Sequence, residues 1–166
     1  MRRSHVYAAN DRKRPHVPSW DEVFMNVAAS IATRSKDPKT QVGACIVDSL
    51  HRVVAIGYNG FPRGCCDDTF PWRDRAARAM HTKYMYVVHA ELNAILNSKH
   101  SVRGGTLYTT RFPCNECTKA LIQAGIRKVL FRDMKHIHSD SVLASIRMLA
   151  AARVECLRIA SGDGTL

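Results

Sequence analysis

The amino-acid sequence lacks the features of membrane and secreted proteins. Its 166 residues include no apolar run near the ~20 residues that a membrane-spanning helix needs, and no apolar signal-peptide core follows the basic start. No internal repeat is visible. The length and an apolar content of 46% fit a single soluble domain with a sizeable hydrophobic core.

The part of the chain expected to fold also has no block of like charges. The net charge of +11 is spread along the sequence. Such a surplus suits an anionic small substrate as well as a polynucleotide, so charge alone does not choose between them. No aromatic platform of the kind that single strands stack on is visible, which counts against a nucleic-acid-binding module.

The sequence does contain metal-binding residues at an informative spacing: His89, then Cys114 and Cys117. One imidazole and two thiolates suit a tetrahedral zinc whose fourth position is open to water. Glu91, two residues after His89, can reach that water without being a ligand. The pattern H-x-E followed by P-C-x-x-C is the signature of zinc-dependent nucleobase deaminases.

Helix geometry gives this spacing a physical reason. Pro113 suits the first turn of a helix, where its missing N–H is not needed. Cys114 and Cys117 are three residues apart and therefore face the same way on a helix. Thiolates at a helix N-terminus are stabilised by the dipole, which lowers their pKa. His89 is expected to open a second helix, so two helix starts would converge on one ion.

A purely structural zinc is the alternative to a catalytic one, because Cys-x-x-Cys pairs also occur in zinc knuckles and redox dithiols. Structural sites usually close with a fourth protein ligand, and no fourth Cys or His follows here at short spacing. We therefore favour the catalytic site, with one zinc per chain. Cys65, Cys66 and His81 are loose candidates for a second, structural zinc, although paired cysteines with a nearby histidine are more often incidental. With two of the six cysteines assigned to metal, a reducing compartment is favoured over a disulfide framework.

We expect a disordered basic leader at 1–18, a folded domain at 19–160 and a flexible tail at 161–166. The sequence RKRP at 12–15 could be a nuclear address and Arg2-Arg3 the start of an organellar one, although solvated basic tails are commoner. We predict a cytoplasmic location, with the nucleus as the alternative.

The sequence of the folded domain predicts an N-terminal helix and a β-hairpin, followed by alternating strands and helices. Ser19 and Glu22 form a capping box for a helix that should stop near residues 34–36. The predicted strands are 42–47, 53–58, 106–111, 128–131 and 154–159. The predicted helices are 89–98, one that carries the cysteines and ends at Gly125, and 140–151. This order indicates an α/β fold with a mixed sheet and helices on both faces. Residues 61–80 form a long irregular segment, and loops of this length inside a compact domain are usually functional or disordered.

With these parts in place, the chain resembles the deoxycytidylate deaminases of the cytidine deaminase superfamily. The resemblance runs from Trp20 to about Arg158. Besides the zinc motif, it is carried by RSKDP at 34–38, TQVGA at 40–44, GYNG at 57–60 and FPCNEC at 112–117. It implies a three-layer α/β/α fold around a five-stranded mixed sheet, a homohexamer, activation by dCTP and inhibition by dTTP. Met85 and Arg111 depart from the Pro and the apolar residue expected at those positions.

The resemblance and the site chemistry together imply hydrolysis of dCMP to dUMP and ammonia. Zinc would activate a water molecule, while Glu91 would move protons from water to the base and to the leaving amine. Ala90 would offer a backbone contact to the base, and Asn59 would hold the sugar. Ser35, Lys36, Thr40 and Arg111 are candidates for the 5′-phosphate. Asn59 could instead be a turn residue, and Arg111 a solvated residue at a strand end.

The long irregular segment is the candidate effector site. Gly60 and Arg63 lie where the chain leads away from the substrate site, directly after Asn59. Arg63 could pair with a phosphate. Asp67 and Asp68 could hold the Mg²⁺ that accompanies a nucleoside triphosphate. A solvated surface loop is the alternative for this segment. Other functions left open are a related deaminase acting on nucleosides or on RNA or DNA bases, and a catalytically inactive regulatory subunit, against which the intact Glu91 counts.

Overall fold

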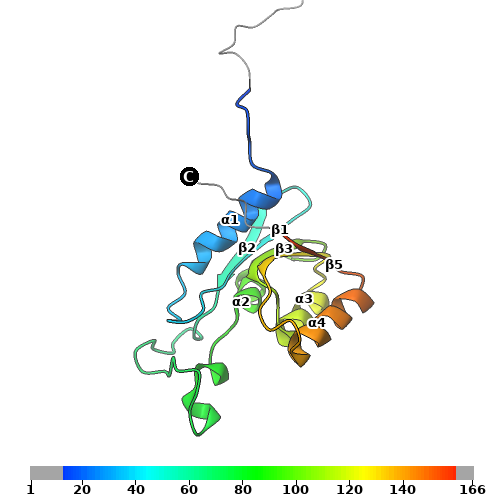
Figure 1. The fold of residues 1–166 in the computed structure, drawn as a ribbon. Helices are drawn as coiled ribbons and strands as arrows, with labels where there is room; N and C mark the ends of the chain where they lie inside the picture. Colours follow the sequence, from blue (N-terminus) through cyan, green and yellow to red (C-terminus); the bar gives the residue numbers. More distant parts are fainter. Residues whose placement is uncertain (1–12, 160–166) are drawn as a thin grey trace, which may run out of the picture.

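The computed structural model describes residues 13–159, which form one sheet of five strands with helices on both faces (Figure 1). The strands are β1 (Gly43–Val47), β2 (Val53–Tyr58), β3 (Thr106–Arg111), β4 (Lys128–Asp133) and β5 (Glu155–Arg158). The α-helices are α1 (Trp20–Ala32), α2 (Ala90–Asn97), α3 (Asn115–Ala124) and α4 (Asp140–Ala151), and two short 3-10 helices are η2 (Ala79–His81) and η3 (Lys83–Met85). The predicted five-stranded α/β/α fold is confirmed.

The sheet has the order β2-β1-β3-β4-β5 and is mixed. β1 pairs antiparallel with both β2 and β3, whereas β3-β4-β5 are parallel. Antiparallel neighbours can be joined by a short turn, but parallel neighbours need a crossover, which α3 and α4 supply. The carboxyl ends of β3 and β4 consequently lie at the same edge of the sheet as the start of β1.

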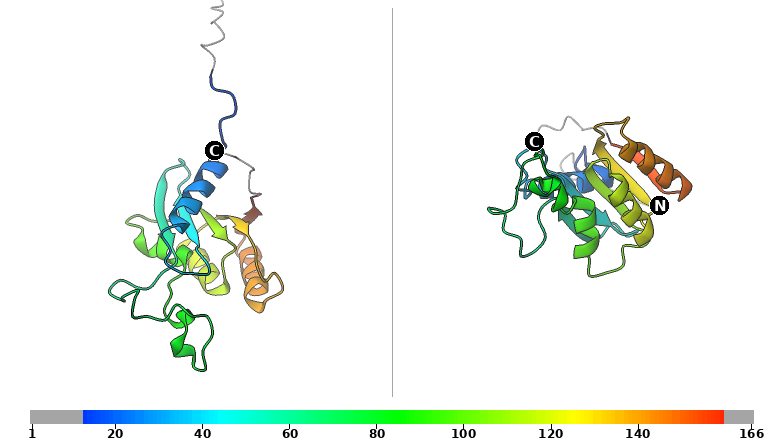
Figure 2. Two further views of the ribbon diagram at one scale, coloured as in Figure 1. Left: turned by 60° about the vertical axis from the view of Figure 1, so that its left-hand side comes forward. Right: turned by 90° about the horizontal axis from the view of Figure 1, so that it is seen from below.

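Two hydrophobic clusters lie on opposite faces of the sheet. α1 packs alone on one face, where Phe24, Met25 and Ala28 meet Cys45 and Tyr108. α2, α3 and α4 share the other face (Figure 1; Figure 2). Alternate residues of β1 explain the division, because successive side chains of a strand point to opposite faces. The buried residues of this second cluster include Ala44, Ile46, Ala90, Ala94, Leu107, Leu121 and Val129.

α2 and α1 lie unusually close to the sheet because two strand glycines leave room for their backbones. A Cβ on Gly57 would come within 2.3 Å of the Ala90 carbonyl oxygen, and one on Gly43 within 2.0 Å of the Ala28 carbonyl oxygen. Both strands therefore need glycine at these positions. The position of α2, which begins beside the candidate metal ligands, depends on Gly57.

The ends of several elements differ from the predictions. The capping box of α1 is confirmed, but the helix ends at Ala32, before the expected 34–36. Pro113 is not in the first turn of α3: Cys114 is the N-cap, so the proline precedes the helix. The expectation was wrong because a cysteine sulfur can itself accept the N–H that a capping side chain normally takes. The segment after β2 is irregular as expected, but it contains η2 and η3 near its end.

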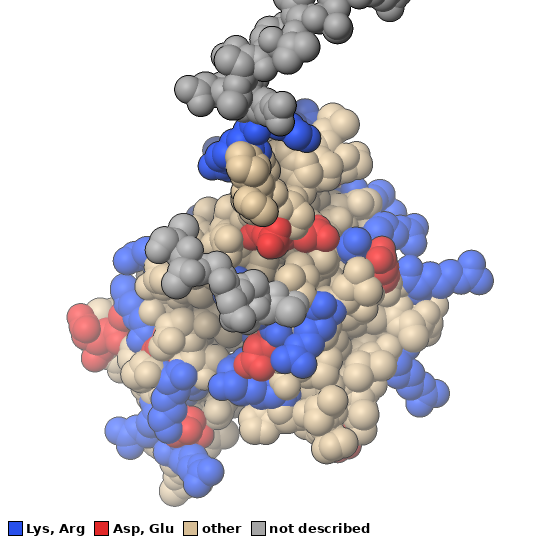
Figure 3. Space-filling model, turned by 45° about the horizontal axis from the view of Figure 1, so that its top comes forward, with Lys and Arg blue, Asp and Glu red and all other residues tan. Residues whose placement is uncertain are grey.

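Residues 13–18 of the predicted leader contain no helix or strand, and the rest of that leader and the tail 161–166 lie outside the described residues. None of the helices in residues 13–159 has the length and apolar character needed to cross a membrane. On the face seen in Figure 3, basic side chains are scattered with acidic ones among them and form no continuous patch. This distribution agrees with the spread of charge in the sequence.

Candidate active site

The three predicted metal ligands converge at the starts of two helices. His89 is the N-cap of α2, and Cys114 is the N-cap of α3. The Nδ1 atom of His89 lies 3.3 Å from the sulfur of Cys114 and 3.5 Å from that of Cys117. The ligand atoms all lie within 4.8 Å of one another. The two helix starts therefore meet as the sequence predicted.

This arrangement fits zinc. Bond lengths of about 2.0–2.1 Å to nitrogen and 2.3 Å to sulfur place tetrahedral ligands about 3.6 Å apart, close to the distances found here. Three protein ligands leave the fourth position open for a reacting molecule. Within residues 13–159, no other three His, Cys, Asp or Glu side chains come this close together, so Cys65, Cys66 and His81 do not assemble a second cluster.

Hydrogen bonds among the two thiols and the imidazole shift the pKa values of all three groups. A hydrogen bond from the Cys117 thiol is the main reason why the pKa of Cys114 falls to about 4. The same bond, followed by burial, raises the pKa of Cys117. The hydrogen bond to the Cys114 sulfur likewise raises the pKa of His89. A group of donors that competes for protons in this way offers a cation negative charge at short range.

Glu91 lies in the first turn of α2 beside the metal ligands but is not one of them. Its side chain is only 4% exposed, and burial raises the pKa of the carboxyl above its ordinary value. A carboxyl group with a raised pKa can hold a proton closer to neutral pH and release it again. Because Glu91 also lines the adjacent cavity, it is placed to exchange protons with a molecule bound there.

A cavity of about 250 Å³ opens beside the three ligands. Its walls come from the loop after α1, the end of β2, the segment before α2, the start of α2, the end of β3 and the start of α3. Its lining residues are Asp37, Thr40, Val42, Asn59, Lys83, Tyr84, Val87, His89, Ala90, Glu91, Arg111, Phe112 and Cys114. Four of the six predicted substrate residues, Thr40, Asn59, Ala90 and Arg111, are thus brought together.

Ser35 and Lys36 do not line the cavity. The Ser35 hydroxyl donates to the Asn59 carbonyl oxygen at 2.8 Å, and Lys36 pairs with Asp67 on the far side of the loop. Ser35 thus contacts the chain that carries Asn59, whereas the side chain of Lys36 is directed to the segment after β2. Spacing in the sequence could not show this, because successive loop residues point in directions that only the folded loop determines.

Asn59 is buried and already engaged in holding the cavity wall. Its side-chain oxygen accepts the N–H of Val42 at 2.8 Å, and its side-chain nitrogen donates to the Thr40 carbonyl oxygen at 2.9 Å. An amide group can make four hydrogen bonds, so one N–H and one lone pair are left for a ligand. The contact to a sugar stays a prediction.

Sequence reasoning missed an ion pair in the cavity wall between Asp37 and Lys83. Their side chains are only 2% and 7% exposed, and Nζ lies 2.5 Å from Oδ2. The two residues are 46 positions apart, one in the loop after α1 and the other at the start of the short 3-10 helix η3. Asp37 belongs to the RSKDP motif at 34–38, which contributed to the family resemblance. For Lys83, the only feature in the sequence that could have indicated a role is its nearness to His89.

The predicted effector residues divide between two hollows on the segment after β2. Gly60, Arg63 and Asp67 line one of about 230 Å³ together with Lys36 and Trp72. Asp68 lines a different hollow with Phe70 and Tyr86. Arg63 is held by a 2.7 Å hydrogen bond to the side-chain oxygen of Asn97, at the end of α2. Arg63 thus links the first hollow to the helix that carries Glu91.

A family model described as "Cytidine and deoxycytidylate deaminase zinc-binding region" matches residues 18–133. The chain belongs to this family. The matched range includes His89, Glu91, Cys114 and Cys117. The resemblance inferred from the sequence motifs is confirmed.

Relatives with curated names agree with this assignment. A probable deoxycytidylate deaminase of Drosophila melanogaster is 54% identical over 152 residues, which cover 88% of this chain and 75% of that protein. The deoxycytidylate deaminase of Homo sapiens is 53% identical over 135 residues, covering 81% and 76%. The chain is therefore similar to these enzymes over nearly all of its folded part.

A solved structure is similar over the same region. The dCMP deaminase of the cyanophage S-TIM5 in complex with dCMP and dUMP is 28% identical, with a TM-score of 0.69. The match covers 87% of this chain and all of that one. The two proteins share the five-stranded α/β/α architecture.

Proposed function

We propose that this chain hydrolyses dCMP to dUMP and ammonia at one zinc per chain. The observation that carries the proposal is the buried carboxyl of Glu91 beside a three-ligand metal site and a cavity of nucleotide-fragment size. Relatives named deoxycytidylate deaminase at more than half identity support dCMP as the substrate. The dUMP formed would supply the synthesis of thymidylate.

When bound, zinc supplies the Lewis acidity that makes a water molecule nucleophilic at neutral pH. The chain supplies the proton transfers. Glu91 accepts a proton as the oxygen of water bonds to C4 of the pyrimidine, and it gives that proton to N3. It then takes the hydroxyl proton and delivers it to the amino group, which leaves as ammonia while the C4 carbonyl forms. The backbone of Ala90 contacts the base, and Asn59 the sugar.

The phosphate of the substrate requires positive charge or N–H donors in the cavity. Arg111 and Thr40 meet this requirement, since both line the cavity, whereas Ser35 and Lys36 act from outside it. Charge-assisted hydrogen bonds contribute about 1.5–3 kcal/mol each, so deoxycytidine should be a much poorer substrate than dCMP.

An ammonia-release assay on dCMP, dCTP, deoxycytidine and cytidine tests the proposal directly. We expect kcat/KM for dCMP to exceed that for deoxycytidine by at least about tenfold, the effect of one charged hydrogen bond. Comparable values for the two would make the chain a nucleoside deaminase. Activity on RNA or DNA in place of dCMP would assign it to the nucleic-acid-editing members of the superfamily.

Regulation by nucleoside triphosphates is the second part of the proposal. The hollow lined by Lys36, Gly60, Arg63 and Asp67 offers two cations for phosphates and a carboxylate for Mg²⁺. A triphosphate there would compete with the Lys36–Asp67 and Arg63–Asn97 contacts. Those contacts adjoin Asn59 and α2, so an effector that displaces them acts on the substrate cavity. dCTP would activate and dTTP would inhibit.

The kinetic test uses Arg63→Ala with Arg75→Ala, an exposed arginine outside the hollow, as its matched control. In the parent we expect sigmoidal dCMP kinetics that dCTP with Mg²⁺ makes hyperbolic and that dTTP suppresses. Coupling of about 1–3 kcal/mol would change the apparent substrate affinity five- to 150-fold. Arg63→Ala should weaken both responses and leave the rate at saturating dCMP unchanged. Unaltered responses to dCTP and dTTP would show that the effectors do not bind in this hollow.

A homohexamer and a cytoplasmic location complete the proposal. Exposed apolar residues on α4 and the edge strands, including Leu143, Ile146, Val53 and Leu157, offer surface for subunit contacts. Light scattering on the purified zinc protein measures the assembly, and a monomer would contradict the hexamer. Microscopy of a tagged chain measures the location, with and without Lys13→Ala and Arg14→Ala to test the nuclear alternative.

A further inference from the structure

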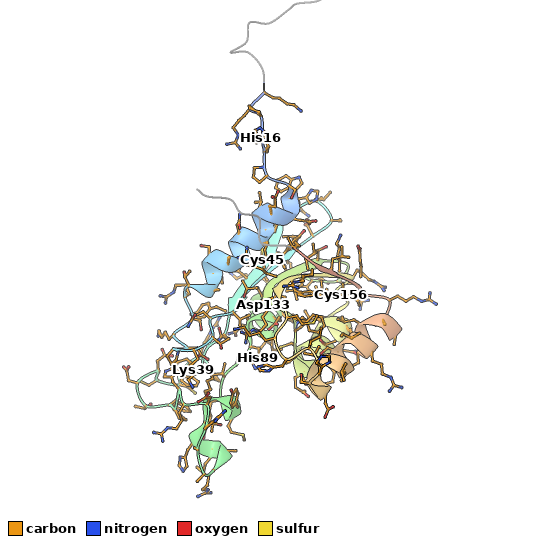
Figure 4. The ribbon with its side chains drawn as sticks, viewed as in Figure 1. His16, Lys39, Cys45, His89, Asp133 and Cys156 are labelled. Atoms are coloured by element: carbon orange, nitrogen blue, oxygen red, sulfur yellow. The ribbon has the colours of Figure 1, made fainter. Side chains whose placement is uncertain are left out.

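Three ion pairs join the loop after α1 to the segment between β2 and α2. They are Lys36–Asp67, Lys39–Asp74 and Lys83–Asp37, half of the six ion pairs found in residues 13–159. Lys39 stands on this loop in Figure 4, facing the segment that projects away from the sheet. No other two parts of residues 13–159 are joined by more than one ion pair.

The three pairs differ in burial. In the first two, both partners are at least 30% exposed, and such surface pairs contribute little. Lys83 and Asp37 are almost fully buried. Removing one member of a buried pair leaves an uncompensated charge, so each side chain depends on the other. Of the three ion pairs, the buried one is therefore expected to contribute most to holding loop and segment together.

Asp37 connects this pair to the substrate side of the cavity. Its Oδ1 atom accepts the backbone N–H groups of Lys39 at 2.9 Å and Thr40 at 3.1 Å, while Oδ2 meets Lys83. The carbonyl oxygen of Thr40 then accepts from the Asn59 side chain at 2.9 Å. A continuous series of hydrogen bonds thus runs from Lys83 through Asp37 and Thr40 to Asn59, and all four residues line the cavity.

Lys83 is also fixed on its own segment. Its backbone N–H donates to the Arg73 carbonyl oxygen at 2.9 Å, and its carbonyl oxygen accepts the N–H groups of Tyr86 and Val87. These backbone contacts do not need the side chain. The ammonium group is thus held at a defined place in the cavity wall, and replacing it should leave the course of the segment intact.

We propose that Asp37 and Lys83 are a positioning pair that sets the affinity of the cavity for its nucleotide. Asp37 shapes the turn that presents Thr40 and Asn59, and Lys83 both neutralises Asp37 and ties that turn to the segment before α2. Neither side chain has a hydrogen bond to the metal ligands or Glu91, so the pair acts on binding and leaves proton transfer alone. This inference rests on the proposed function for the identity of the nucleotide.

The test uses Lys83→Met, Asp37→Asn and the double variant, each in the zinc-loaded protein. Both single variants should keep one zinc per chain, raise the KM for dCMP and the Kd for dUMP by roughly tenfold, and change kcat little. The double variant has no unpaired buried charge and should regain thermal stability. Its affinity for dUMP should stay weak, because the Asp37–Lys83 ion pair is still missing. Lys39→Met and Asp74→Asn each remove the exposed Lys39–Asp74 ion pair, which joins the same loop and segment. These variants are the matched controls and should keep the parental KM.

Two readouts separate this inference from a purely structural role. Loss of folded protein would lower the apparent kcat at an unchanged KM, and the double variant would then recover the parental kcat together with its stability. Either result, or an unchanged KM and Kd in folded single variants, would overturn the proposal.

Hydrogen exchange provides a measurement that needs no nucleotide. The backbone N–H groups of Lys39 and Thr40 donate hydrogen bonds to Asp37. Their protons should exchange with solvent faster in Lys83→Met than in the parent. A parent protein that does not deaminate dCMP would refute the proposed function, while faster exchange of these amides would still support the pair as the element that orders the turn. Unchanged exchange would refute the pair whatever the substrate.

Discussion

The two sides of the cavity are built in different ways. On one side, the metal ligands stand at the starts of α2 and α3, and the helices are held on the sheet by a hydrophobic cluster. On the other side, Thr40 and Asn59 belong to irregular chain that hydrogen bonds and ion pairs hold in place. The first side is built from short sequence motifs at two helix starts. The second depends on hydrogen bonds and an ion pair between residues far apart in the sequence.

The largest effect is expected on the metal side, from Cys114→Ala. This change removes a ligand and the N-cap of α3 together. Zinc content should fall from one per chain to near zero, and deamination should become undetectable. Metal analysis of the purified variant measures this, with Cys66→Ala as the control because Cys66 is an exposed cysteine outside the cluster. Equal zinc in Cys114→Ala and the parent would point to another set of ligands.

Glu91→Gln separates metal binding from proton transfer. The three ligands remain, so zinc should stay bound, whereas kcat should fall by about 10²–10⁴-fold, the usual contribution of a general acid–base group. Steady-state kinetics at saturating dCMP and zinc analysis of the same sample measure both quantities. Retention of more than about a tenth of the activity would exclude the proton-transfer role.

Gly57→Ala and Gly43→Ala compare the two faces of the sheet. An added Cβ meets the backbone of α2 in the first case and that of α1 in the second. Both changes should lower the free energy of unfolding by about 1–3 kcal/mol or more, as overpacking does. Only Gly57→Ala should also weaken zinc binding, because α2 begins beside His89. Chelator competition measures this, and equal zinc affinity in both variants would mean that the ligands adjust independently of α2.

The smallest effect concerns a cysteine away from the metal. Cys45 lies under α1, on the other face of the sheet from His89 (Figure 4), and burial raises the pKa of its thiol from 9.0 to about 12. Between these values the unfolded chain loses the proton and the folded chain keeps it. The free energy of unfolding should therefore fall as pH rises above 9.0, by up to ~1.4 kcal/mol per pH unit.

Denaturant titrations of the parent and Cys45→Ala from pH 8 to 11 measure this slope. The variant starts from a lower stability because it loses buried volume, but its curve should decline less steeply with pH. Parallel curves would show that the thiol ionises equally in both states. The contrast with Cys114, whose pKa is lowered, shows how the surroundings of a thiol decide its charge.

Much of the fold and the metal side of the site could be predicted from local patterns. Neighbouring residues determine the capping box of α1, the two strands around the turn at 48–52 and the alternation of strands and helices after Gly104. The same holds for His89, Glu91, Cys114 and Cys117. A spacing of two or three residues at a helix start fixes which way the side chains point, so the sequence alone determined these groups.

Tertiary structure alone decided the other side of the cavity. Ser35 and Lys36 are sequence neighbours of Asp37, yet they do not line the cavity, whereas Asp37 does. Lys83 reaches Asp37 across 46 residues. No periodicity governs irregular chain, so the direction of each side chain there follows from long-range hydrogen bonds and from the cost of burying a charge without its partner. Those energies exist only once the two segments have met.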